Sequence, residues 1–156
     1  MRTVRGTVGG AFVLGILLAT GACEKEYHFE PPDRDERIGE AEVLYSPLMF
    51  DSVTWADDEA RAATGNEVFA AECRNCHGTL GRGGTDYAGQ RSLAVPSLVE
   101  PGWRFAASMD SVRHRVFVGH VSGMPTWGVA GITHREIDAV AYYLLERLRP
   151  EVLEGG

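Results

Sequence analysis

The chain has 156 residues, 44% of them hydrophobic, and a formal net charge of −7. Residues 24–60 contain twelve acidic and three basic side chains, whereas the ten acidic and ten basic side chains after residue 60 balance each other. The acidity therefore belongs to one segment. The sequence lacks the basic footprint of a nucleic-acid-binding protein, which excludes that class of partner.

Residues 1–22 are expected to be an export signal. Arg2 and Arg5 give it a positively charged start, and the apolar run over residues 8–19 is too short for a convincing membrane span. A run of small residues follows and ends at Cys23. This run can be an ordinary signal-peptidase site or a lipobox, in which Cys23 is acylated. A lipobox usually has leucine at the position of Thr20. Because an unpaired thiol is a liability in an oxidising compartment, we favour acylation of Cys23 over a spare cysteine.

Residues 23–60 are expected to form an acidic tether. Residues 24–37 are charged, are interrupted by Pro31-Pro32 and show no apolar periodicity, so we expect them to be extended or disordered. Residues 43–55 are instead rich in apolar and aromatic side chains, among them Tyr45 and Trp55. A plain spacer has no need of these, and we favour docking on another subunit. Packing against the chain's own following domain is the alternative.

A first helix is predicted to begin at Thr64, which forms a capping-box pattern with Glu67, and to lead into Cys73-Arg74-Asn75-Cys76-His77. This C-x-x-C-H spacing is typical of covalent haem c, with two thioether links to one porphyrin and His77 as the proximal iron ligand. A zinc half-site is disfavoured because no second C-x-x-C or H-x-x-x-H is present. A redox dithiol is disfavoured because the motif follows a helical pattern.

The rest of the chain is predicted to alternate between loops and helices. Residues 78–84 are glycine-rich and lack the G-K-[ST] of a phosphate loop, so we expect a loop against the porphyrin edge. A middle helix is predicted over residues 108–117, capped by Ser108 and ended by Gly119.

The last helix has the clearest start, a capping box formed by Thr133 and Glu136. Its buried stripe is predicted to consist of Ile137, Val140, Ala141, Leu144 and Leu148, with Tyr143 beside it. Pro150 is expected to end this helix, which leaves residues 151–156 as a C-terminal tail.

Over residues 61–150 the chain resembles class I mono-haem cytochromes c. The features that carry the resemblance are the first helix, the C-x-x-C-H motif, the glycine loop, the turn at Met124-Pro125 and the terminal helix. The resemblance implies a mostly α fold, in which three or more helices and loops wrap around one covalent haem. In that family a glycine and an aromatic residue precede the first cysteine, as Gly65 and Phe69 do here. The first and last helices cross near an aromatic residue of the last helix, here Tyr143.

The resemblance also implies the sixth iron ligand, which in the family lies in a turn like Met124-Pro125. The soft thioether of Met124 suits a haem of raised potential. His120 is the alternative ligand and would give a bis-histidine site.

Two further contacts follow from the same resemblance. In the family a proline carbonyl accepts the proximal imidazole proton, and Pro96 is the candidate here. Trp103 and Arg104 are candidates for contact with a haem propionate. The alternative is a core tryptophan beside a surface arginine.

With both axial positions filled, the resemblance implies an electron-transfer protein without catalytic residues. A lipid on Cys23 would hold the domain at the periplasmic side of the cytoplasmic membrane, close to a quinol-oxidising or terminal-oxidase complex of a respiratory chain. One alternative is a haem enzyme or enzyme subunit with a labile sixth ligand, and another is a structural subunit in which haem only stabilises a small domain.

Overall fold

A computed structural model describes residues 33–84 and 95–155 of the chain. In chain order its elements are α1 (Arg34–Leu44), the 3-10 helix η1 (Pro47–Phe50), α2 (Asp58–Val68), the π-helical turn η2 (Phe69–Cys73), α3 (Arg74–His77), α4 (Met109–Val118), α5 (Trp127–Ala130), α6 (His134–Tyr143), the π-helical turn η3 (Leu144–Leu148) and α7 (Arg149–Glu154).

The expectation of a mostly α fold is confirmed, since this described part holds no β-strand beyond one isolated bridge between His120 and Met124. The predicted signal peptide and Cys23 lie outside the described residues. Within residues 33–84 and 95–155, no helix combines the length and the apolar character needed to cross a bilayer.

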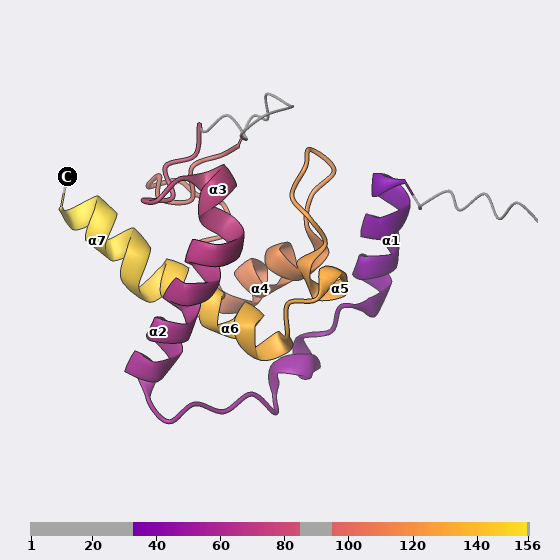
Figure 1. Ribbon diagram of the computed structural model, residues 1–156, viewed down its shortest axis with the longest axis horizontal. Coiled ribbons are helices and arrows are strands. Elements are labelled where there is room, and N and C mark those ends of the chain that lie inside the picture. Colours follow the sequence, from indigo (N-terminus) through magenta and orange to yellow (C-terminus); the bar gives the residue numbers. More distant parts are fainter. Residues whose placement is uncertain (1–32, 85–94, 156) are drawn as a thin grey trace, which may run out of the picture. The chain divides into compact units, whose positions relative to one another are not determined.

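The crossing of α2 and α6 organises the fold (Figure 1). Gly65 lies at the crossing point, where a Cβ atom would lie 2.5 Å from Cβ of Tyr143 and would collide with the carbonyl oxygen of Ala139. The rings of Phe69 and Tyr143 meet beside it, with centroids 5.8 Å apart. The absence of a side chain at residue 65 therefore lets the two helices approach closely. The predicted stripe is confirmed, since all its members are buried: Ile137, Val140, Ala141, Leu144 and Leu148.

Helix starts were predicted correctly for two of the three helices. Ser108 caps α4 by accepting a hydrogen bond from the N–H of Ser111, and α4 ends at Gly119 with φ of 77°. Thr133 and Glu136 form the expected capping box of α6. The start at Thr64 is wrong, because Asp57 caps α2 and accepts the N–H of Ala60 at 2.7 Å.

The prediction that Pro150 ends the last helix is also wrong. The helix continues through η3 into α7, with Pro150 in the first turn of α7. The N–H of Arg149 bonds to the carbonyl of Leu144, five residues before it. A π turn is wider than an α turn, and this relieves the collision that a proline ring makes with the carbonyl four residues earlier. Residues 151–154 are therefore helical and not a tail.

The segment before α2 is more ordered than the sequence indicated. Asp33 accepts the N–H of Glu36 at 2.8 Å and so caps α1, because an aspartate at this position satisfies an amide that the helix leaves unpaired. The expectation of an extended chain is therefore wrong for residues 34–37. Its remaining part, residues 24–32, lies outside the described residues.

Residues 45–55 pack against the chain's own domain, which was the alternative to docking elsewhere. The hydroxyl of Tyr45 donates to Oδ1 of Asp110 at 2.5 Å, and Phe50 is buried in the core. The indole Nε1 of Trp55 donates to Oδ2 of Asp138 at 2.7 Å.

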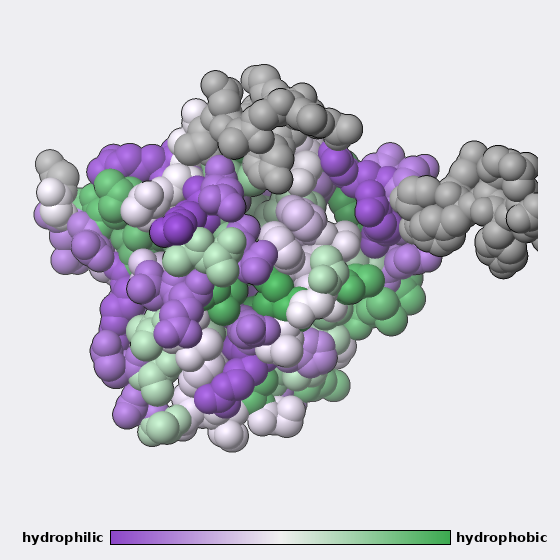
Figure 2. Space-filling view, in the orientation of Figure 1, coloured by the Kyte–Doolittle hydropathy of each residue, from purple (hydrophilic) through white to green (hydrophobic). Residues whose placement is uncertain are grey.

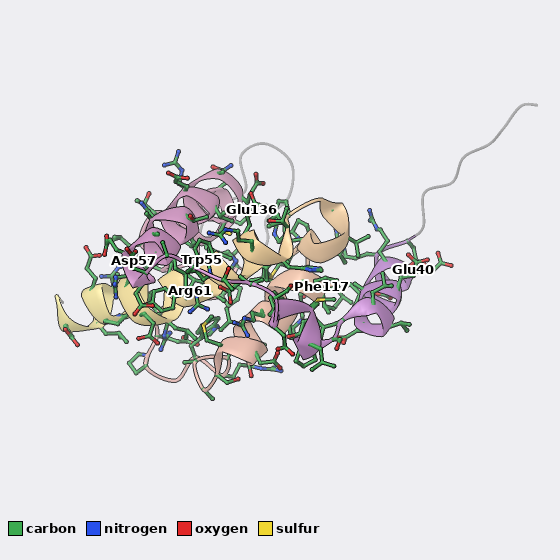
Figure 3. All side chains as sticks on the ribbon, turned by 90° about the horizontal axis from the view of Figure 1, so that it is seen from below. Glu40, Trp55, Asp57, Arg61, Phe117 and Glu136 are labelled. Carbon is green, nitrogen blue, oxygen red and sulfur yellow. The ribbon has the colours of Figure 1, made fainter. Side chains whose placement is uncertain are left out.

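A buried charged cluster fixes this segment to three helices. Asp138 on α6 is only 1% exposed, and its carboxylate accepts hydrogen bonds from Trp55, from Nε and Nη2 of Arg61 on α2, and from Arg113 on α4. Trp55 and Arg61 lie near each other in Figure 3. Burial alone would raise the pKa of Asp138, but these hydrogen bonds outweigh it and hold the pKa below its ordinary value.

Candidate haem-binding site

The C-x-x-C-H motif begins at Cys73, the last residue of the π turn η2, and its other four residues, Arg74 to His77, form α3 (Figure 1). Cys73 and Cys76 are half-buried and stand one helical turn apart, so they occupy the same side of the chain. The short helix ends at Gly78, whose φ is 76° and whose N–H donates to the carbonyl of Arg74 at 2.8 Å. This spacing suits two thioether links to one planar group.

The surroundings of the two thiols differ from those of a metal-thiolate site. Burial, with smaller effects of Glu72 and Cys76, raises the pKa of Cys73 to about 12. Burial therefore favours the neutral thiol form of Cys73. Within the two described stretches of the chain, no three His, Cys, Asp or Glu side chains are grouped as ligands for a metal ion.

His77 is held by the backbone of Pro96, as the resemblance implied. The distance from Nδ1 of His77 to the carbonyl oxygen of Pro96 is 3.3 Å, and a carbonyl only accepts, so Nδ1 carries the proton. Burial lowers the pKa of His77, while the bond to Pro96 opposes this effect. A neutral imidazole with its proton on Nδ1 leaves the Nε2 lone pair free for a metal.

The glycine loop explains how Pro96 reaches this place. The N–H of Gly84 donates to the carbonyl of Val95 at 3.0 Å, and the N–H of Leu98 donates to the carbonyl of Gly81 at 2.8 Å. A Cβ atom on Gly83 would lie 2.5 Å from the carbonyl oxygen of Val95 and 2.7 Å from that of Pro96. The glycines therefore allow two backbone segments to lie against each other. Their place at the porphyrin edge stays a prediction.

Met124 lies in a closed turn that begins at Gly119. The N–H of His120 donates to the carbonyl of Met124 at 3.0 Å, and a Cβ on Gly119 would lie 2.6 Å from that same oxygen. Met124 is half-buried and packs against the hydrophobic core. The rival ligand His120 is exposed, and its Nδ1 accepts the N–H of Ser122 at 3.1 Å. Of the two alternatives, the methionine is the one that faces the interior.

Trp103 belongs to the core. It is 7% exposed, its ring centroid lies 5.8 Å from that of Phe105, and the guanidinium of Arg149 lies over its ring at 5.1 Å. Arg104 is exposed, with its guanidinium 4.7 Å from the centre of the Phe105 ring. The pair thus consists of a core tryptophan and a surface arginine, and contact with a haem propionate stays a prediction.

Arg115 on α4 is a candidate that the sequence did not reveal. Its Nη1 donates to the carbonyl of Gly119 at 2.7 Å, and its guanidinium lies 4.8 Å from the ring centre of Phe105, which it shares with Arg104. Nε of Arg115 is buried and has no hydrogen-bond partner among residues 33–84 and 95–155. Burial and the charge of Arg104 lower the pKa of Arg115. A buried donor without a partner costs about 1–3 kcal/mol, so the site fits an anionic acceptor such as a haem propionate.

Residues 60–144 match the family described as cytochrome c oxidase, cbb3-type, subunit III. The similar curated proteins include the cbb3-type cytochrome c oxidase subunit CcoP of Rhodobacter capsulatus. It is 30% identical over an alignment of 93 residues that covers 56% of this chain and 29% of that protein. The CcoP of Cereibacter sphaeroides is 31% identical over 87 residues, or 56% of this chain and 28% of the relative. The chain thus spans less than a third of the length of these relatives. No solved structure matches the chain.

The family match covers α2, the C-x-x-C-H motif, the Met-Pro turn and α6. The same elements carried the resemblance to class I cytochromes c, and that resemblance is confirmed. Because the match extends over more than half of its residues, the chain belongs to the family of cbb3-type cytochrome c oxidase subunit III, and its haem domain is a class I-like cytochrome c.

Proposed function

We propose that the chain is a one-electron carrier with a single haem c, covalently linked to Cys73 and Cys76, with His77 and Met124 as axial ligands. The observation that carries this proposal is the 3.3 Å contact between Nδ1 of His77 and the Pro96 carbonyl, because His77 directly follows Cys76, the second of the two thiols. It leaves Nε2 available as a ligand. When bound, the haem supplies the one-electron couple of its iron.

The other residues hold and tune the group. The half-buried Met124 presents a neutral thioether, which favours a higher potential than a second imidazole would. Arg115, with Arg104 beside it, offers cationic donors to a propionate. With His77 and Met124 as its ligands, the iron would have no open position for a substrate, and we therefore infer electron transfer and not catalysis.

The partner we propose is a membrane-bound respiratory complex, namely a terminal oxidase or a quinol-oxidising complex. The support is that the relatives named above are subunits of cbb3-type oxidases. The sequence of residues 1–23 supports export to the periplasmic side of the cytoplasmic membrane, with an acyl anchor on Cys23. Such an anchor raises the effective concentration of the domain near its partner without tight binding.

We propose that three exposed side chains in the segment before α2 dock on the partner complex. Val43, Leu44 and Leu48 are 86%, 57% and 73% exposed. Figure 2 shows apolar surface beside the hydrophilic surface of α1, and Glu40 points away from the other helices in Figure 3. An apolar patch beside acidic side chains fits a partner surface with apolar and basic residues.

Axial ligation is the part of the proposal that a spectrum tests. In the purified full-length holoprotein, Met124→Ala should abolish the near-infrared absorption of methionine-ligated ferric haem and allow the ferrous protein to bind CO. His120→Ala is the matched control, in the same turn, and should leave both unchanged. If the wild-type protein binds CO readily, the alternative of an enzyme with a labile sixth ligand is favoured. If only His120→Ala alters the spectrum, the proposed ligand is wrong.

A further inference from the structure

Arg149, the first residue of α7, lies beyond residues 60–144, which match the family. Its side chain is charged, yet the residue is only 7% exposed. Nη1 donates to the carbonyl of Leu98, and Nη1 and Nη2 lie 3.4 and 3.3 Å from the carbonyl oxygen of Glu100. The guanidinium also covers the ring of Trp103. A permanently charged side chain is therefore committed to the backbone of a single loop.

Taking a charge out of water is unfavourable unless hydrogen bonds replace the lost solvent. Arg149 obtains this replacement from backbone carbonyls of the loop, and Glu100 adds a favourable electrostatic interaction that opposes the effect of burial on the pKa of Arg149. The planar guanidinium fork reaches two carbonyls at once, which the single ammonium of a lysine does not reproduce. The arrangement therefore constrains the loop more tightly than one hydrogen bond would.

The same loop carries the acceptor of the His77 proton. Leu98 is held from both sides, since its N–H donates to Gly81 and its carbonyl accepts from Arg149. Pro96, two residues earlier in this short loop, accepts the bond from Nδ1 of His77. A chain of direct contacts thus runs from the C-terminal helix to the candidate proximal ligand.

The π turn η3 brings α7 to this loop. Leu148, the last residue of η3, is 3% exposed, and its Cδ2 would lie 3.2 Å from a Cβ atom on Gly81. The end of η3 therefore packs on the glycine loop at Gly81. The next residue, Arg149, contacts the neighbouring loop at Leu98 and Glu100. Single π turns inside α-helices are frequent at functional sites.

We propose that Arg149 is a positioning residue for the proximal ligand: by holding the carbonyls of Leu98 and Glu100, it fixes the Pro96 carbonyl that accepts the Nδ1 proton of His77. This inference rests on the proposed function, in which His77 is an iron ligand. A hydrogen bond from Nδ1 makes the imidazole a more basic ligand. Arg149 therefore tunes the redox potential of the site from outside the ligand set.

The test compares Arg149→Lys and Arg149→Met with Arg147→Met in the full-length holoprotein, after haem content has been confirmed by pyridine haemochrome. Lysine keeps the charge but loses the fork. Arg147 is a suitable control because it is two residues away and its side chain is 42% exposed. Its Nη2 lies 3.7 Å from Oε2 of Glu59, whose side chain is 85% exposed. Two quantities are measured: the hydrogen exchange of the His77 Nδ1 proton, by NMR of the reduced protein, and the midpoint potential.

Both Arg149 variants should exchange the Nδ1 proton faster, by about tenfold, which corresponds to about 1.4 kcal/mol. Arg149→Lys should also raise the midpoint potential, because a less basic imidazole stabilises ferric iron less while the charge is unchanged. Arg147→Met should match the wild type in both. The inference would be overturned if Arg149→Lys kept the exchange rate and the midpoint potential of the wild type. It would also be overturned if Arg149→Lys, Arg149→Met and Arg147→Met all changed these quantities equally. A wild-type chain without covalent haem would instead refute the proposed function, so the two failures are distinguishable.

Discussion

Replacing Asp138 with asparagine keeps the size of the side chain but removes the negative charge through which α6 binds Trp55, Arg61 of α2 and Arg113 of α4. The carboxylate is 1% exposed and receives hydrogen bonds from Arg61, Arg113 and Trp55. Breaking a buried ion pair by removing one partner costs about 3–5 kcal/mol. The side chains of Arg61 and Arg113 are 18% and 20% exposed, so water can rehydrate them in part. We therefore expect the lower end of this range, about 3 kcal/mol.

The assay is guanidinium chloride unfolding of the full-length holoprotein, followed by far-UV circular dichroism. Glu59→Gln is the matched control, because Glu59 is 85% exposed and lies 3.7 Å from Arg147. An exposed pair of this kind contributes about 0–1 kcal/mol. A domain of this size has a total stability of about 5–15 kcal/mol, so the loss at Asp138 would be a large fraction of it.

The same substitution should change the pH dependence of stability. The pKa of Asp138 is depressed in the folded state, so its contribution is present above the ordinary aspartate value of 3.8 and is lost as the pH falls through the lower folded value. The asparagine variant should therefore lose less stability than the wild type between neutral and strongly acidic pH. A variant that unfolds at the same denaturant concentration as Glu59→Gln, with a wild-type acid profile, would refute the role assigned to the cluster.

Three further outcomes are expected. Gly65→Ala should lower the free energy of unfolding by about 1–3 kcal/mol, because the new methyl group collides with the backbone of α6 at Ala139. Thermal denaturation measures this loss, and unchanged stability would mean that the helices do not cross there. Arg115→Leu should lower the midpoint potential in a redox titration, since loss of a nearby positive charge favours ferric iron, and the exposed Arg37→Leu should not. Leu48→Asp should leave the unfolding free energy within about 0.5 kcal/mol of the wild type, because the side chain is exposed, and a larger loss would show that it packs within the chain.

Local signals in the sequence predicted much of the helical framework. Thr133 and Glu136 satisfy each other within one helical turn, and Ser108 and Gly119 act on their own helix, so neither pair needs information from elsewhere in the chain. Thr64 shows the weakness of such signals. A threonine also fits inside a helix, where its hydroxyl donates to the carbonyl of Ala60, and an aspartate further upstream provides the actual cap.

The contacts that the sequence did not predict are those between distant residues. Asp138 follows a buried position and has no apolar character, and its partners are separated from it by 83, 77 and 25 residues: Trp55, Arg61 and Arg113. The partners of Arg149 lie 51 and 49 residues earlier. Periodicity describes single helices, whereas these contacts depend on how helices and loops meet.

The candidate site shows the same difference between local signals and contacts that depend on the fold. Its covalent motif, Cys73 to His77, is read directly from spacing. Pro96 came only through the resemblance to a family, and Met124 came through the resemblance together with the ligand chemistry of a thioether. Arg115 was missed, because no motif marks it and its significance appears only when its buried Nε is seen beside Phe105.

The central claim is that one haem is bound covalently through Cys73 and Cys76. The most direct measurement is the intact mass of the full-length protein, purified from a host that assembles c-type cytochromes and then extracted with acidified acetone. The account predicts that the colour stays with the protein and that the mass exceeds that of the polypeptide by one haem, located by fragmentation on the peptide containing residues 73–77. Colour that passes into the acetone, or a mass equal to that of the bare polypeptide, would contradict it.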